Sequence, residues 1–162
     1  MTAPDRIRAM AADLGFVAVG FGPADVGADG ARFLQWLAAG RAGDMHYLHR
    51  NRDRITAPTA WAPAARSVVA LAAAYGERPG ALADGARIAR YAVGRDYHRV
   101  LGRATRRLRD LLAAEGVPHA AMKVGTDAVP VLERALAVRA GIGFLAKSSM
   151  VISARQGPYL LL

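Results

Sequence analysis

Apolar residues recur at helical spacing in several segments of this 162-residue chain. This spacing predicts helices at residues 4–15, at about 28–39, from 96 or 97 to 115, and at 130–140. Glycines stand at or just after the ends of these segments, at Gly15, Gly40, Gly116 and Gly141. Since glycine is favoured where a helix stops, the pattern predicts helices with defined C-terminal ends.

Near-continuous apolar runs between these segments predict strands. The runs are residues 16–21, 67–75, 119–124, 150–153 and 159–162. Residues 67–75 begin with β-branched side chains, which favours a strand buried on both faces. The last two runs flank a Gln-Gly-Pro turn at residues 156–158, which gives the end of the chain hairpin character.

The alternation of strands and helices predicts an α/β (α+β) fold, a mixed β-sheet with flanking helices, in a single domain of residues 1–162. Phe33, Leu34 and Leu37 are expected to face inward from the second helix. Residues 40–63, rich in Gly, Arg, His and Pro, are either a long loop or short helical turns.

The net charge is +9, from 22 basic and 13 acidic residues. It favours an anionic partner such as nucleic acid, or it reflects an arginine-rich, alanine-rich composition without functional cause. The chain has no cysteine, which excludes disulfides and cysteine-ligated iron–sulfur clusters within it. The first 15 residues do not resemble a signal peptide, and no apolar run reaches about 18 residues. A cytoplasmic protein without membrane contact is expected.

A first group of candidate site residues lies in RYAVGRDYH, residues 90–98. Asp96 is expected to cap the helix that follows. Tyr91 and Tyr97 suit either a pocket wall or half-buried packing. The charged form of His98, beside two arginines, is expected to be disfavoured, and a structural role is favoured for it.

Arginines dominate the helix that follows this group. Arg99, Arg103, Arg106 and Arg107 are spaced to share one outer face. Such a face can pair with phosphates of nucleic acid through its guanidinium groups, or it can simply be solvated.

Two further groups follow. Asp127 stands at a predicted strand-to-helix junction, where it can cap the helix or act as a general acid, and the second role needs a raised pKa. Gly141 and Gly143 permit close backbone approach to a ligand, although the full dinucleotide-binding fingerprint is absent. The four histidines show no metal-ligand spacing, so no metal site is predicted.

Taken in order, these segments resemble the N-terminal, cobalamin-binding domain of the epoxyqueuosine reductases, which complete queuosine in tRNA. The pieces that carry the resemblance are LGF, WLAAGRAGDMHYL, Arg54, RSVVALAAAY, RYAVGRDYH, TDAVPVLERALAVRAGIGF and Lys147. They span nearly the whole chain. The D-Y-H and D-x-x-P-V-x-E-R pieces, in this order and at this distance, are the specific ones.

The resemblance implies a fold similar to the cobalamin-binding domain of reductive dehalogenases, and reduction of epoxyqueuosine to queuosine at the tRNA wobble position. It implies that Asp127 is the proton-donating acid. The cofactor-binding residues that it implies are Asp96, Tyr97, Arg134, Gly141, Gly143 and Lys147. The arginine face becomes a candidate tRNA contact. In the family, electrons come from two iron–sulfur clusters in a following ferredoxin-like domain.

The chain departs from the family pattern at several positions. Phe144 stands where the family has Trp, Ala146 where it has Gly, and Ala57 where it has an acid. The chain also ends where the family's cluster domain would begin, so its electrons are expected from a separate iron–sulfur partner. An apolar strand at residues 159–162 predicts association between chains. Two alternatives remain open at this point: a non-catalytic corrinoid- or tRNA-binding module, and an inactive fragment.

Overall fold

A computed structural model describes residues 1–76, 80–127 and 129–162. Its centre is a three-stranded sheet in the order β1-β2-β7, built from Ala18–Pro23, Ser67–Ala74 and Leu160–Leu161. β1 pairs antiparallel with β2, and the end of β2 pairs antiparallel with β7. Two further antiparallel pairs join β3 (Gly80–Ala81) to β4 (Arg87–Ile88) and β5 (Phe144–Leu145) to β6 (Val151–Ile152). The predicted α/β class with flanking helices is confirmed.

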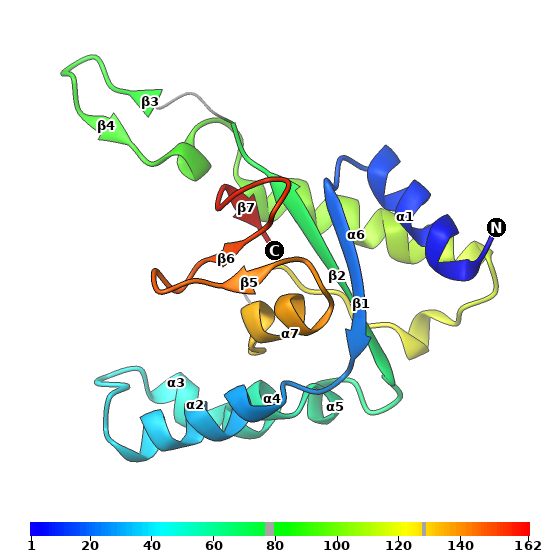
Figure 1. Ribbon diagram of the computed structural model, residues 1–162, viewed down its shortest axis with the longest axis horizontal. Coiled ribbons are helices and arrows are strands. Elements are labelled where there is room, and N and C mark those ends of the chain that lie inside the picture. The colour runs from blue at the N-terminus through cyan, green and yellow to red at the C-terminus, as the bar shows by residue number, and fades with distance from the viewer. Residues whose placement is uncertain (77–79, 128) are drawn as a thin grey trace.

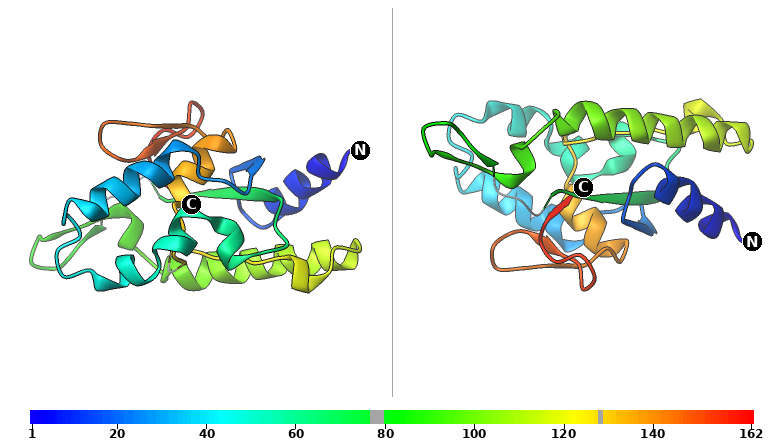
Figure 2. Two further views of the ribbon diagram at one scale, coloured as in Figure 1. Left: turned by 90° about the horizontal axis from the view of Figure 1, so that it is seen from below. Right: turned by 90° about the horizontal axis from the view of Figure 1, so that it is seen from above.

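Helices cover both faces of the central sheet. The long helices are α1 (Ala3–Asp13), α2 (Ala28–Ala38), α6 (Tyr97–Ala114) and α7 (Glu133–Arg139). Seen from above, β1 and β2 lie between α6 on one side and the β5–β6 segment on the other (Figure 2). α2 lies with the short helices α3 (His46–Arg50), α4 (Arg52–Thr56) and α5 (Pro58–Trp61) in a layer beneath the sheet (Figure 1). The short-helix alternative for residues 40–63 is therefore confirmed.

Two helix starts show why the sequence folds this way locally. Thr2 caps α1 in a reciprocal pair with Asp5, with Pro4 in the first turn. The Asp96 side chain accepts a hydrogen bond from the backbone N–H of His98 at 3.0 Å and so caps α6 as predicted. Gly116, with φ +96°, follows the end of α6.

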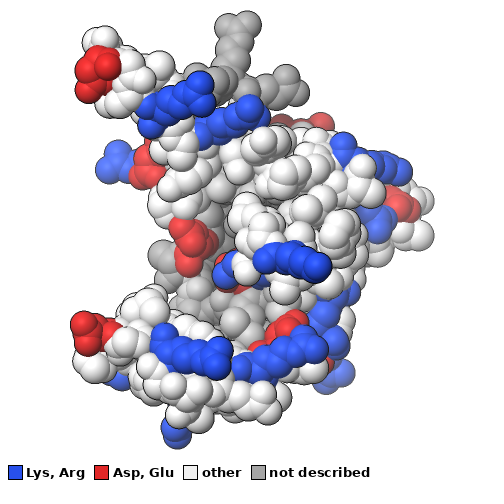
Figure 3. Space-filling model, turned by 60° about the vertical axis from the view of Figure 1, so that its left-hand side comes forward, with Lys and Arg blue, Asp and Glu red and all other residues white. Residues whose placement is uncertain are grey.

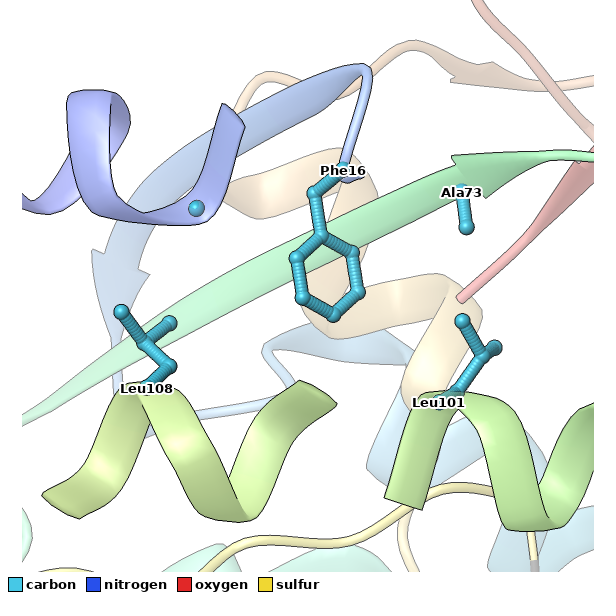
Figure 4. Packing of buried hydrophobic residues seen from close by; sticks show 5 residues of the cluster. Phe16, Ala73, Leu101 and Leu108 are labelled. Carbon is cyan, nitrogen blue, oxygen red and sulfur yellow. The ribbon is translucent and has the colours of Figure 1, made fainter. Parts of the chain in front are cut away.

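β2 separates two apolar clusters, because successive side chains of a strand point to opposite faces. Ala73 packs with Phe16, Leu101 and Leu108 between the sheet, α1 and α6 (Figure 4). Ala72 packs on the other face in a cluster with Ala137, Ile142, Val151 and Leu160. The predicted burial on both faces therefore holds at the end of β2, whereas its first half is only partly covered.

A close contact between β1 and α7 fixes the second layer. A Cβ atom added to Gly20 would lie 2.2 Å from the backbone oxygen of Ala140, so only glycine lets α7 approach this near. Nearby, Arg139 donates a 2.8 Å hydrogen bond from its guanidinium to the Asp25 carboxylate. These contacts hold α7 against the strand that precedes α2.

Several expectations are corrected. Residues 119–124 form a 3-10 turn, η2 (His119–Ala121), and an extended segment in place of a strand, because no described strand pairs with them. The last helix begins at Glu133 and not at residue 130. Leu34 is 43% exposed and does not face the core. The two terminal runs do not pair with each other, since β6 pairs with β5 and β7 with β2. Association between chains stays a prediction.

Candidate active site

The candidate site lies at the first turn of α6, where Asp127 joins Asp96, Tyr97 and His98. The Tyr97 hydroxyl donates a 2.6 Å hydrogen bond to Asp127 Oδ2. The same oxygen lies 2.9 Å from His98 Nε2. His98 Nδ1 lies 2.9 Å from Asp96 Oδ1, so the imidazole is held between two carboxylates. Segments about 30 residues apart are thereby brought into one cluster.

Asp127 occupies an irregular segment and not a helix cap. Its φ is +54°, in the left-handed region that Asp tolerates better than most residues with a side chain. Leu132, five residues further on, is the residue that precedes α7, so the capping role predicted for Asp127 is wrong. The side chain is 54% exposed, and its carboxylate is available both to its partners and to a ligand.

The charges of this cluster differ from those expected from sequence. The pKa of Asp127 is lowered, first by the Tyr97 hydrogen bond and then by that of His98, against the opposing effect of desolvation. Hydrogen bonds to Asp96 and Asp127 raise the pKa of His98, so its charged form is favoured and the expectation from its arginine neighbours is wrong. The bond to Asp127 raises the pKa of Tyr97 to about 12. The ionised form of Asp127 and the protonated form of His98 are therefore both favoured.

The two shifts set a pH window for the cluster. His98 has a raised pKa, so its contribution to stability is full below its unfolded value of 6.5 and is lost as pH rises through the folded pKa. Asp127 has a lowered pKa, so its contribution is full above 3.8 and is lost as pH falls through the folded pKa. The stabilisation from the His98–Asp127 ion pair is therefore full between pH 3.8 and pH 6.5, and it decreases below and above this range.

We expect a histidine titration to show this coupling directly. In a proton NMR titration of the ring Cε1–H signals, His98 should titrate above 6.5, and Asp127→Asn should move its pKa downward because one anionic partner is removed. His46, on α3, serves as the internal reference. An unchanged His98 titration in the Asp127→Asn variant would show that the contact is absent in solution.

The other cofactor-binding candidates lie in a different part of the fold. The Arg134 guanidinium donates a 2.7 Å hydrogen bond to the backbone oxygen of Ser149, which ties α7 to the turn between β5 and β6. Lys147 is exposed in that same turn. The structure gives Arg134 a role in positioning this turn, and contact of either residue with a corrinoid stays a prediction.

Gly141 and Gly143 border a separate cavity. They line a hollow of about 530 Å³ between α1, β1 and residues 152–156, whose wall also includes Phe16 and Arg155. A Cβ atom added to Gly143 would lie 2.2 Å from the backbone oxygen of Ile152, and Gly141 has φ +80° after α7. The backbone conformation or the close packing at each position thus explains why it is glycine. Asp127 is not among the residues that line this cavity.

The arginine face predicted on α6 is present. Arg99, Arg103, Arg106 and Arg107 are all exposed on this helix. Arg99 stays within 3.8 Å of the Asp96 carboxylate, which places the start of the face beside the cluster around Asp127. Within the described part of the chain, no group of three or more metal-ligating side chains is found, and no helix is long and apolar enough to cross a membrane.

A comparison with known families and proteins extends this picture. Residues 55–128, which include the Asp96–His98 segment and Asp127, match the family model described as epoxyqueuosine reductase QueG, DUF1730. An epoxyqueuosine reductase of Xanthomonas campestris is 35% identical over 97% of this chain and 46% of its own length. The chain is similar to part of the epoxyqueuosine reductases. That of Gloeobacter violaceus is 38% identical over 97% of this chain and 49% of its own length. The chain thus spans about half the length of these relatives.

Solved structures of epoxyqueuosine reductases share the fold. The enzyme from Streptococcus thermophilus superposes with a TM-score of 0.82 at 26% identity, over 99% of this chain and 44% of its own. An epoxyqueuosine reductase solved with an epoxyqueuosine-modified tRNA-Tyr stem loop gives 0.78 at 26% identity, over 98% and 43%. A third, from Bacillus subtilis, gives 0.73 at 27% identity, over 97% and 42%, and has an aspartate-bearing catalytic loop swung out of the active site.

His98 is the member of this cluster that sequence reasoning missed. Its neighbours in sequence are arginines, whereas its partners in space are Asp96 and Asp127. The D-x-H spacing was the available signal, because a residue that caps a helix lies near the side chain two positions later. The involvement of Asp127 could not be read from local spacing.

Proposed function

We propose that this chain is the corrinoid-binding, proton-donating part of an epoxyqueuosine reductase, acting on epoxyqueuosine at the tRNA wobble position. The observation that carries the proposal is the Asp127 carboxylate, held at 2.6 Å by Tyr97 and at 2.9 Å by His98 on an open face. The family match over residues 55–128 supports the substrate class. The tRNA stem loop bound by a related enzyme supports RNA as the carrier.

The fit of a corrinoid to this chain is supported by the shape of the surface. Figure 3 shows a hollow between the α2–α5 layer and the elements above it. The elements that border the hollow carry exposed apolar side chains, among them Leu34, Met45 and Leu145. A broad ring with apolar faces suits such walls. Asp127 and Tyr97 would border the ligand, with Arg134 and Lys147 as candidates for its polar edge.

Conversion of an epoxide to an alkene consumes two electrons and two protons and releases water. A reduced corrinoid, when bound, supplies the electrons at the epoxide. The residues of this chain would supply the first of the two protons: His98 passes its Nε2 proton to Asp127, and Asp127 delivers it to the departing oxygen. The second proton, which completes the water that is released, comes from solvent. Asp96 holds the opposite ring nitrogen, so Nε2 stays directed at Asp127.

Ligand binding provides the driving force for this proton transfer. Free Asp127 has a lowered pKa and is half exposed, so alone it is a poor acid. A corrinoid and a nucleoside that cover it would remove water, and desolvation raises the pKa of a carboxyl group. The proton then moves from His98 to Asp127 as the substrate arrives, which matches the general acid to its task.

Three further assignments belong to the same proposal. The electrons come from iron–sulfur clusters outside these 162 residues, since the residues include no cysteine to ligate a cluster. The arginine face of α6 contacts the tRNA backbone, because guanidinium groups pair with phosphates. The fold of this part is similar to the cobalamin-binding domain of reductive dehalogenases, and the protein works in the cytoplasm.

A visible-absorption titration tests the proposal. On mixing with cob(II)alamin, we expect the spectrum to shift toward the base-off form, and Asp127→Asn should show the same shift because the acid is not needed for binding. With a strong reductant and epoxyqueuosine-containing tRNA, only the wild-type chain should then form queuosine. Binding without turnover would favour a non-catalytic module. No spectral change with cob(II)alamin would overturn the corrinoid assignment.

A further inference from the structure

A row of four tyrosine rings leads away from Asp127 across the surface. Tyr97, which donates to Asp127, meets Tyr91 edge to face at 6.1 Å between ring centroids. Tyr91 meets Tyr75 at 6.4 Å, and Tyr75 meets Tyr159 at 5.8 Å, again edge to face. These rings come from α6, from the turn η1 (Arg90–Ala92), from the end of β2 and from the segment before β7.

Two rings of this row are open, and they alternate with two that are partly covered. Tyr91 is 49% exposed and Tyr159 is 43% exposed, whereas Tyr75 and Tyr97 are partly covered. Edge-to-face packing holds each ring at a fixed angle to the next, so the two exposed rings are positioned before any ligand arrives. Exposed aromatic rings held in this way are unusual for a surface that meets only water.

Positive charge lies against the Tyr159 end of the row. The Arg90 guanidinium lies 4.6 Å from the centre of the Tyr159 ring, in a cation–π contact. Arg87, Arg95 and Arg99 lie in the same stretch of sequence, where the one acid, Asp96, already holds His98. Figure 3 shows basic side chains gathered at the β3–β4 end of this face, above the hollow. Aromatic rings bordered by guanidinium groups suit a ligand that is both flat and anionic.

We propose that Tyr91, Tyr159 and Arg90 form a stacking platform for an unpaired nucleobase of the RNA substrate, next to the nucleotide that reaches Asp127. Single-stranded loops are recognised by bases that unstack and lie on aromatic or arginine planes. Charge complementarity favours RNA over an apolar protein segment, because Arg90 lies against the Tyr159 ring and a guanidinium group can pair with a phosphate. The inference rests on the proposed function only in taking the loop that carries epoxyqueuosine as the RNA.

The platform lies one ring away from the catalytic cluster. Tyr97 takes part in both, through its hydroxyl to Asp127 and its ring edge to Tyr91. A base on Tyr91 therefore belongs to a nucleotide close to the one being reduced. The platform would help to hold the loop open, so that the modified base alone enters the site.

Fluorescence of a labelled RNA tests the platform. The probe is an unmodified tRNA-Tyr anticodon stem loop with 2-aminopurine beside the wobble position, titrated with the purified chain. Stacking on a tyrosine ring should quench the emission. Tyr91→Phe should bind and quench as the wild type does, whereas Tyr91→Leu and Tyr91→Ala should bind about tenfold more weakly and lose the quenching. Tyr47→Ala, at an exposed tyrosine of α3 outside the row, should match the wild type.

Equal binding and quenching by the wild type and Tyr91→Leu would overturn the platform and leave the patch to a protein partner. The platform would also be overturned if Tyr91→Phe lost as much RNA binding and quenching as Tyr91→Ala, because the hydroxyl and not the ring would then matter. Absence of RNA binding by the wild type would also overturn the platform. Circular dichroism confirms that each variant is folded. Corrinoid binding is measured separately, so an unchanged cob(II)alamin spectrum alongside a Tyr91-dependent RNA signal would reject the proposed function alone.

Discussion

Replacing Asp127 by Asn is expected to lower the turnover of epoxyqueuosine-containing tRNA by about 10²- to 10⁴-fold, the usual contribution of a positioned general acid. The amide keeps the size of the side chain, and Asn tolerates the left-handed backbone at this position almost as well as Asp. It cannot, however, carry the proton from His98 to the substrate. The measurement is single-turnover conversion with cobalamin and an excess of chemical reductant.

The control for Asp127→Asn needs another exposed carboxylate that lies outside the cluster of Asp96, Tyr97, His98 and Asp127. Asp13, an exposed residue at the end of α1, is suitable, and Asp13→Asn should retain wild-type turnover. The cob(II)alamin spectrum should be the same in both variants, which separates proton delivery from cofactor binding. Wild-type turnover by Asp127→Asn would remove the acid from the proposed mechanism.

Replacing Phe16 by Ala is expected to lower the free energy of unfolding by about 3–5 kcal/mol. Phe16 is 6% exposed and fills the space between α1, α6 and the end of β2 (Figure 4). Its removal leaves a cavity that Leu101 and Leu108, fixed on one rigid helix, cannot close. A domain of this size is usually stable by only about 5–15 kcal/mol, so the loss is a large fraction of the total.

Urea unfolding followed by circular dichroism measures this loss. The neighbouring Val17 is 43% exposed, and Val17→Ala should cost well under the Phe16 value because it buries little area. A loss below about 1 kcal/mol in Phe16→Ala would mean that the cluster between α1 and α6 does not hold the domain together.

Local signals in the sequence predicted α6 well and the strands less well. A long amphipathic repeat between Asp96 and Gly116 marks that helix, because cap, stripe and stop all agree. Residues 119–124 have the apolar character of a strand, but a strand also needs a partner, and the described sheets leave none there. The short β5 at Phe144–Leu145 was missed for the opposite reason: it has a partner but too few residues to show a pattern.

The candidate site, too, could be predicted only as far as its residues are close in the sequence. Asp96 and Tyr97 follow each other in the sequence, so their common place at the start of α6 could be predicted. The charge state of His98 could be predicted only in part, because its pKa is raised first by Asp96, two positions before it, and then by Asp127, 29 residues away in the sequence. The general-acid role of Asp127 requires a raised pKa, whereas in this structure hydrogen bonds from Tyr97 and His98 lower it.

The position of the cluster on α6 has a consequence for protein design. The first turn of this helix carries Tyr97 and His98, and the next carries Leu101, which is anchored against Phe16. The packing of α6 against the core therefore sets the orientation of Tyr97 and His98 relative to Asp127. The sequence Asp-Tyr-His alone does not set it. Grafting Asp-Tyr-His onto the helix of an unrelated scaffold would transfer the side chains but not the angle at which they meet the carboxylate.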